Sequence, residues 1–317
     1  SRMKLILLLF LFPSAVLAST ECGFRLNEEG TVTNARHKRV VGGNLVTTSG
    51  RWPWQVYLYL RFNKTVTNGV CGGTVLSDRW ILTAAHCVLY SPGNPINDVV
   101  VMAEVTNSSS DSILNSIANK HTYRAQKLIP HENNNFSYGE DDIALIELES
   151  PLQLDHLVSP ICLPNREQRV PQDGQAVATG FGNSNVRGTN ETKNDRQLRE
   201  TIVPIVRKDI CGERYTKAQH VAARDADTWE QFKIICAGSM GHDTGSGDSG
   251  GPLVMKSSDG RWFQIGVTSF GDESVEGDRI PGAYTDVREY CEWINEKTMG
   301  EVKCQEKEVT LQDVEIK

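Results

Sequence analysis

Short apolar runs separated by turn residues dominate the chain. The runs over residues 80–87 and 142–146 are typical, and Gly, Pro, Asn and Ser residues lie between runs of this kind. Only the segment Glu289 to Thr298 has its apolar residues at the spacing of an amphipathic helix. The pattern therefore predicts an all-β protein with a C-terminal α-helix.

The first residues have the pattern of an export signal. The apolar run Leu5 to Phe12 follows Lys4 and leads to a small-residue site that ends at Ala18. This run is shorter than the roughly 20 residues that a membrane-spanning helix needs, which disfavours an anchor. We expect residues 1–18 to be a signal peptide and the protein to be secreted, with no membrane partner.

Composition and charge narrow the class of protein further. The 317 residues include 39% hydrophobic residues, enough for a large core. The net charge of −7 and the absence of a basic block argue against a nucleic-acid partner. Eight cysteines without a Cys-x-x-Cys pair favour disulfides over a metal site. Four sequons predict glycosylation in a secreted chain, at Asn63, Asn107, Asn135 and Asn190.

A serine framed by glycines is the strongest candidate for chemistry. Ser249 lies in Gly247-Asp248-Ser249-Gly250-Gly251-Pro252, where the amides of Gly247 and Ser249 are candidates for an oxyanion hole. Taken alone, such a segment is more often a plain turn. A serine nucleophile also requires a base and an orienting carboxylate, and His86 and Asp142 stand in apolar runs suited to these roles. Asp141 is the alternative acid, but the register of the Ile-Ala-Leu run favours Asp142.

Three motifs together carry a family resemblance. Thr-Ala-Ala-His86-Cys, Asp142-Ile-Ala-Leu and Gly-Asp-Ser249-Gly-Gly-Pro resemble the trypsin-like serine peptidases of the chymotrypsin fold, over about Val40 to Thr298. The resemblance implies two packed antiparallel six-stranded β-barrels, with His86 and Asp142 in the first and Ser249 in the second. It divides the chain into a propeptide or light chain (19–39), a peptidase domain (40–299) and a polar C-terminal tail (300–317).

The resemblance also implies a substrate pocket. Asp243 matches the residue at the base of the primary specificity pocket, where a carboxylate favours Arg or Lys. Gly271 and Gly282 match its walls, and Ser269 begins the segment that pairs with the substrate backbone. The competing interpretation is that Asp243 is a solvated turn residue.

An activation site is the next implication. Arg36-His-Lys-Arg39 followed by Val40-Val-Gly-Gly resembles a zymogen junction, cleaved after Arg39 so that the new amino terminus at Val40 pairs with Asp248. The basic run also resembles a proprotein convertase site, and its alternative interpretation is an exposed basic stretch.

The same resemblance pairs cysteines and exposes two departures. It implies Cys71–Cys87, Cys211–Cys236 and Cys22–Cys162, which leaves Cys291 and Cys304 for each other. Two disulfides that most relatives have are absent, because Gly245 and the site near Ser274 carry no cysteine, and neither do Ala176 and Met255. The interval between Cys211 and Cys236 is long, and its residues 218–227 are a candidate helical insertion at the cleft rim.

These observations predict a serine endopeptidase made as a zymogen, with neither cofactor nor metal. Its expected partners are protein or peptide substrates, an activating protease and protein inhibitors. The alternatives are an inactive protease-fold binding protein and an endopeptidase with another specificity.

Overall fold

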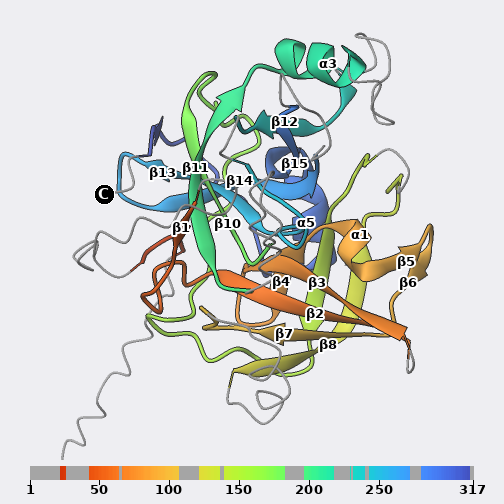
Figure 1. Ribbon diagram of the computed structural model, residues 1–317. Coiled ribbons are helices and arrows are strands. Elements are labelled where there is room, and N and C mark those ends of the chain that lie inside the picture. The colour runs from red at the N-terminus through yellow and green to blue at the C-terminus, as the bar shows by residue number, and fades with distance from the viewer. Residues whose placement is uncertain are drawn as a thin grey trace, which may run out of the picture.

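Two closed groups of antiparallel strands form most of the molecule (Figure 1). The computed structural model describes residues 22–25, 43–63, 66–106, 121–135, 139–182, 196–217, 229, 231–239, 243–271 and 280–314. In Figure 1 the first group is coloured orange to yellow and lies below the second, which is green to blue.

The first barrel has six strands in the order β2-β3-β4-β9-β8-β7, and pairing of β2 with β7 closes it. The strands are β2 (Gln55–Asn63), β3 (Val66–Val75), β4 (Trp80–Thr83), β7 (Asp98–Met102), β8 (Thr122–Pro130) and β9 (Ala144–Leu148). A short hairpin of β5 (Leu89–Ser91) and β6 (Asn94–Pro95) follows β4. Apolar residues of β4 and β9 are fully buried, which explains why these runs are continuous in the sequence.

The second barrel also has six strands, and pairing of β11 with β12 closes it. Its strands are β10 (Gln175–Gly180), β11 (Arg199–Val206), β12 (Ile234–Ala237), β13 (Pro252–Ser257), β14 (Trp262–Phe270) and β15 (Gly282–Asp286). Two short strands extend it: β1 (Asn44–Leu45) pairs with β11, and β16 (Leu311–Gln312) pairs with β13.

Both barrels repeat one pattern of strand pairing. In each, the first strand pairs with the second and fourth, and the third with the second and sixth. The prediction of two packed antiparallel six-stranded barrels is therefore confirmed. It explains the many short runs in the sequence, since each barrel needs six strands and a turn after each.

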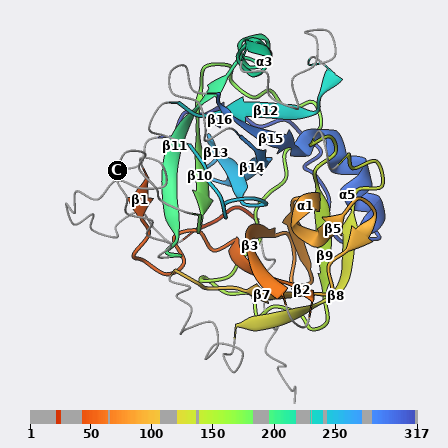
Figure 2. The ribbon, with the colours of Figure 1, turned by 45° about the vertical axis from the view of Figure 1, so that its right-hand side comes forward.

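In the described part of the chain four short helical segments accompany the barrels: α1 (Ala85–Val88), α3 (Lys208–Lys217), a 3₁₀ turn η1 (Val287–Tyr290) and α5 (Cys291–Lys297). The predicted C-terminal helix corresponds to η1 and α5. The sequence analysis did not predict α3, which lies above β12 in both Figure 1 and Figure 2. Within the described residues no helix is long and apolar enough to cross a membrane.

Buried polar and aromatic contacts join the two barrels. Glu200 of β11 accepts hydrogen bonds from Arg51 Nε at 2.6 Å and from Trp52 Nε1 at 2.7 Å. The ring of Trp52 in turn meets that of Trp262 edge to face, with centroids 4.9 Å apart. Because these groups lose their water on burial, the carboxylate needs these paired donors.

The last described segment packs on the body of the protein. Val302 and Leu311 are buried, and Cys304 is bonded to Cys291 of α5. The side-chain amide of Gln168 forms two bonds with the backbone of Val309, each 2.8 Å long. The described part of the polar tail is therefore a strap against both barrels.

Candidate active site

The register of β4 and β9 brings His86 and Asp142 together. Thr83 pairs with Ala144, so the chain leaving β4 and the chain entering β9 lie at the same end of the barrel. His86 follows Thr83 by three residues and Asp142 precedes Ala144 by two. The intervening Ala84 and Ala85 are fully buried, which agrees with the need for small side chains beside the imidazole.

Hydrogen bonds fix the orientation of the imidazole. His86 Nδ1 lies 2.7 Å from Asp142 Oδ2, and the His86 amide donates to Asp142 Oδ1 at 2.9 Å. With Nδ1 as the donor to the carboxylate, Nε2 is left as the basic nitrogen. The carboxylate also accepts a short hydrogen bond from Ser269, and Thr285 Oγ1 donates to the Asp142 carbonyl at 2.8 Å. Both of these donors belong to the second barrel.

The pair shifts the pKa of each member. Burial alone would lower the pKa of His86, but the charge of Asp142 and their hydrogen bond raise it above its ordinary value. Burial alone would raise the pKa of Asp142. The positive charge on His86 and the hydrogen bonds from His86 and Ser269 hold it below its ordinary value instead. The geometry therefore favours an ionised carboxylate beside the imidazole.

Asp141 points to a different set of groups. Its backbone has a φ of 48°, and its Oδ1 accepts from Lys233 at 2.9 Å and from the Tyr290 hydroxyl at 2.8 Å. The two neighbouring carboxylates thus have separate partners. Of the two, only Asp142 contacts His86, which agrees with the choice made from the register of the apolar run.

The Ser249 loop is held close to the segment that precedes His86. Ser249 accepts a hydrogen bond on its carbonyl from the Gly72 amide at 2.7 Å. A Cβ on Gly250 would collide with the Thr83 hydroxyl and stand 3.1 Å from the Ala84 nitrogen, so only glycine fits there. Among the described residues the Ser249 hydroxyl makes no hydrogen bond, and its bond to His86 is not formed in this conformation.

The backbone amides of the loop divide into two groups. Those of Asp248, Gly250 and Gly251 donate to carbonyls at 2.8 to 3.0 Å. In the described part of the chain, the amides of Gly247 and Ser249 have no protein acceptor. Gly247 adopts a φ of 99°, which a residue with a side chain rarely takes. These two amides are therefore the ones that can receive an oxyanion.

The side chain of Asp248, a residue of this loop, is buried. It is 2% exposed, and its two oxygens accept from the amides of Gly182 at 2.7 Å and Gly245 at 2.9 Å. A Cβ on Gly182 would stand 2.6 Å from the carboxyl carbon, so the glycine leaves room for the carboxylate. Arg39 and Val40, the predicted activation junction, lie outside the described residues.

Asp243 is buried between glycines rather than placed on a solvated turn. It is 8% exposed, and a Cβ on Gly238 or Gly282 would stand 2.9 or 2.8 Å from its carboxylate. A Cβ on Gly271 would stand 3.7 Å from the Gly282 Cα, so these two glycines face each other. The carboxylate is therefore flanked by backbone that carries no side chains at these positions.

The structure contains the four disulfides that the sequence analysis gives: Cys22–Cys162, Cys71–Cys87, Cys211–Cys236 and Cys291–Cys304. In place of one missing family disulfide, Ala176 and Met255 are fully buried in the core of the second barrel. At the other, the Gly245 amide is bonded to Asp248, and the site near Ser274 lies outside the described residues.

The remaining predicted sites are divided between described and undescribed segments. Asn63 ends β2, and Asn135 is half-buried with its amide nitrogen 3.3 Å from a Glu140 carboxylate oxygen. Asn107 and Asn190 lie outside the described residues, as does the proposed helical insertion at 218–227. In the described ranges one group of side chains is close enough to hold a metal ion: Cys71, His86 and Cys87. The two cysteines of this group are joined by a disulfide.

Sequence reasoning missed two contributors to this site. Thr285 supports the Asp142 backbone and Gly238 makes room for Asp243. Neither lies in a recognisable motif. The signal available for Thr285 is a hydroxyl-bearing residue within the buried run of β15. The signal available for Gly238 is a glycine directly after the apolar run of β12.

Comparison with known proteins gives the site its context. A family model described as Trypsin matches residues 40–294. A tryptase of Mus musculus is 34% identical over 256 residues, which cover 81% of this chain and 87% of the relative. The match spans both barrels and every residue of the constellation built on His86, Asp142 and Ser249. The chain belongs to the trypsin family and is a serine-type endopeptidase.

Proposed function

We propose that the enzyme cleaves peptide bonds after Arg or Lys, with His86, Asp142 and Ser249 as its catalytic residues. The observation that carries this proposal is the buried carboxylate of Asp243 next to Gly238 and Gly282, which together with Gly271 would form the walls of the substrate slot. A cation that enters the slot pairs with a buried carboxylate, whereas an apolar side chain gains no such charge pairing.

The chemistry follows from the hydrogen bonds around His86. Nε2 of His86 takes the proton of the Ser249 hydroxyl as its oxygen attacks the scissile carbonyl, and later gives it to the leaving amine. The Asp142 carboxylate holds the tautomer and stabilises the imidazolium. The amides of Gly247 and Ser249 receive the negative charge of the tetrahedral intermediate. Water then hydrolyses the acyl-enzyme on Ser249 by the reverse sequence.

Activation is proposed to follow cleavage after Arg39. The new ammonium group at Val40 pairs with the buried carboxylate of Asp248. Because Asp248 lies between Gly247 and Ser249, this pairing sets the position of both oxyanion amides. The basic run that ends at Arg39 makes a proprotein convertase the proposed activator.

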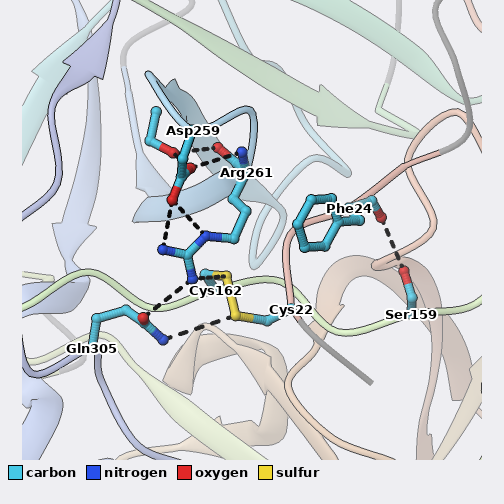
Figure 3. The surroundings of a disulfide bond; sticks show 8 residues. Cys22, Phe24, Ser159, Cys162, Asp259, Arg261 and Gln305 are labelled. Atoms are coloured by element: carbon cyan, nitrogen blue, oxygen red, sulfur yellow. Dashed lines mark hydrogen bonds and ion pairs between the residues drawn. A yellow bond between two sulfur atoms is a disulfide. The ribbon is translucent and has the colours of Figure 1, made fainter. Parts of the chain in front are cut away.

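The light chain is proposed to remain attached after activation. Cys22 is bonded to Cys162, and Gly23 forms backbone hydrogen bonds with Pro160 at 2.8 Å and Trp262 at 2.9 Å. Figure 3 shows the side chains of Gln305 and Arg261 in contact with the two sulfurs of this disulfide. It also shows the Ser159 hydroxyl donating a hydrogen bond to the Phe24 carbonyl. The disulfides suit an oxidising compartment, which supports the proposed signal peptide, secretion and glycosylation.

The test of specificity compares substrates that differ only in the residue before the cleaved bond. The chain, activated after Arg39, should hydrolyse Arg and Lys peptides and be labelled by an organophosphonate, with Ser249→Ala as the unlabelled control. Asp243→Asn should lower kcat/KM for the Arg peptide by about 10⁴-fold, because the substrate cation loses its buried partner. Turnover of a Phe peptide alone would contradict the Arg/Lys specificity, and no labelling would contradict the roles given to the triad.

A further inference from the structure

The two walls of the Asp243 slot are joined by no disulfide. All eight cysteines form four pairs elsewhere in the molecule, so no sulfur is left for the walls. One wall is formed by Phe270, the last residue of β14, and by Gly271. The other is formed by the residues from Ile280 to Gly282, where β15 begins. Since a specificity pocket must keep its width to discriminate between side chains, something else has to hold these walls.

Tyr215 of α3 contacts both walls at once. Its hydroxyl donates to the Pro281 carbonyl at 2.8 Å, and its ring meets the Phe270 ring edge to face with centroids 5.7 Å apart. Tyr215 is fully buried. The same side chain thus binds the last residue before one pocket glycine and packs on the residue before the other.

Trp229 fixes Tyr215 from the opposite side. The two rings are stacked, with centroids 4.9 Å apart and planes 29° from parallel. Trp229 is 1% exposed and also packs on Phe232 at 5.3 Å. Its indole nitrogen is buried and has no hydrogen-bond partner among the described residues, so packing alone holds the ring there.

Gly212 makes room for this tryptophan. A Cβ on Gly212 would stand 2.5 Å from Trp229 Cδ1 and 2.7 Å from Cγ, distances that the rigid buried ring cannot accept without moving. The Cys211–Cys236 disulfide ties the same turn of α3 to β12, which pairs with β15 at Gly282. The helix, the tryptophan and the pocket wall therefore form one packed unit.

We propose that Trp229 is a positioning residue for the primary specificity pocket: it holds Tyr215 against Phe270 and Pro281, and this aromatic brace sets the pocket width that no disulfide sets. The inference rests on the proposed function, since it assigns the pocket to the side chain before the cleaved bond. It gives Tyr215 and Trp229, in the described part of the interval between Cys211 and Cys236, the role of a support behind the pocket.

The experiment weakens the brace in two independent ways in the full activated enzyme. Trp229→Phe removes the orphaned indole nitrogen together with part of the ring overlap. Gly212→Ala replaces glycine by a better helix former and displaces the Trp229 ring. Trp80→Phe is the matched control, because Trp80 is equally buried but belongs to β4 of the first barrel.

The readouts separate pocket width from chemistry. Inhibition by benzamidine reports the pocket, and labelling by diisopropyl fluorophosphate reports Ser249 and His86, with active-site titration counting only folded enzyme. We expect both brace variants to raise the benzamidine Ki and the KM for an Arg peptide about three- to tenfold, the effect of one aromatic pair. The labelling rate and the values for Trp80→Phe should stay at those of the wild type.

An unchanged Ki in both variants would overturn the proposal and leave the brace a purely structural cluster. Tyr215→Phe, which keeps the ring and removes only the bond to Pro281, should raise the Ki about fivefold. Phenylboronate separates the two levels of inference, because it binds at Ser249 and places an uncharged ring in the same pocket. If the wild type does not bind benzamidine, the Arg/Lys specificity is refuted. A lower affinity for phenylboronate in the variants than in the wild type would still support the brace.

Discussion

The two barrels share one strand pattern but hold their parts of the active site by different means. In the first, the Cys71–Cys87 disulfide lies directly beside His86, and Asp142 accepts two hydrogen bonds from that residue. In the second, Ala176 and Met255 pack in the core in place of one disulfide, and Tyr215 packs behind the proposed pocket from α3, which the Cys211–Cys236 disulfide ties to β12. The comparison indicates that a disulfide and hydrogen bonds hold His86, whereas a disulfide together with aromatic packing supports the wall of the proposed pocket.

The largest test of this comparison removes one catalytic group from each barrel. Ser249→Ala should lower kcat by about 10⁶-fold, because the nucleophile is lost. Asp142→Asn should lower it by about 10⁴-fold, since the imidazole then adopts the wrong tautomer. Active-site geometry, checked by benzamidine binding, should be unchanged in both variants. Equal and small losses would mean that these residues do not form the catalytic unit.

The next test compares the two kinds of support directly. Cys71→Ala with Cys87→Ala should reduce the free energy of unfolding by about 3 kcal/mol, as expected for a loop of this length. Met255→Ala should cost a similar amount, about 2 to 5 kcal/mol, because it leaves a cavity in the second core. Denaturant unfolding measures both. We expect kcat to fall only in the cysteine variant, and a fall in both would remove the distinction between the barrels.

A smaller effect is expected where the second barrel supports the acid of the first. Ser269→Ala deletes the hydroxyl that donates to Asp142 Oδ2. A hydrogen bond to a charged group contributes about 1.5 to 3 kcal/mol, so kcat/KM should fall about tenfold or somewhat more. Ser258→Ala is a control on the same barrel, since Ser258 is exposed in the turn after β13. An unchanged rate would show that the Asp142 carboxylate needs no donor from the second barrel.

The smallest effect concerns pH. Because the Asp142 charge raises the pKa of His86, the histidine becomes neutral, and therefore able to act as a base, only above its ordinary value of about 6.5. The acid limb of kcat/KM should thus lie above pH 6.5 and move down in Asp142→Asn. Asp141→Asn should leave the limb in place, since its partners are Lys233 and Tyr290. A limb that moved equally in both variants would mean that the two acids are not distinct.

Much of this architecture could be read from the sequence, because the residues concerned are local. The alternation of short runs and turns predicts the strands, and the catalytic residues stand within a few positions of a strand end. The contribution of Thr285 could not be read in this way. It reaches Asp142 across 143 positions of the chain, and only the closure of both barrels brings the two together.

The pocket brace escaped sequence reasoning for a different reason. Helix α3 has no clear apolar face, because Tyr215 and Cys211 are buried among charged neighbours such as Asp209 and Lys217. The long interval after Cys211 suggested an insertion at the rim of the cleft. In the described part of this interval, Trp229 and Tyr215 lie behind the pocket wall. Aromatic residues that pack on one another from positions far apart in a loop produce no periodic pattern of apolar residues in the sequence.

The strap that crosses the Cys22–Cys162 disulfide sets an order of events during biosynthesis. Cys22 emerges from the ribosome 140 residues before its partner, so the bond between them must wait until the six strands of the first barrel have been made, and it can form before those of the second. Gln305, whose side-chain nitrogen lies 3.9 Å from Cys22 Sγ, is made after the six strands of each barrel. Until then the new disulfide has no strap over it and stays open to exchange. Synthesis of the segment around Gln305 is therefore the step that completes the anchorage of the segment around Cys22.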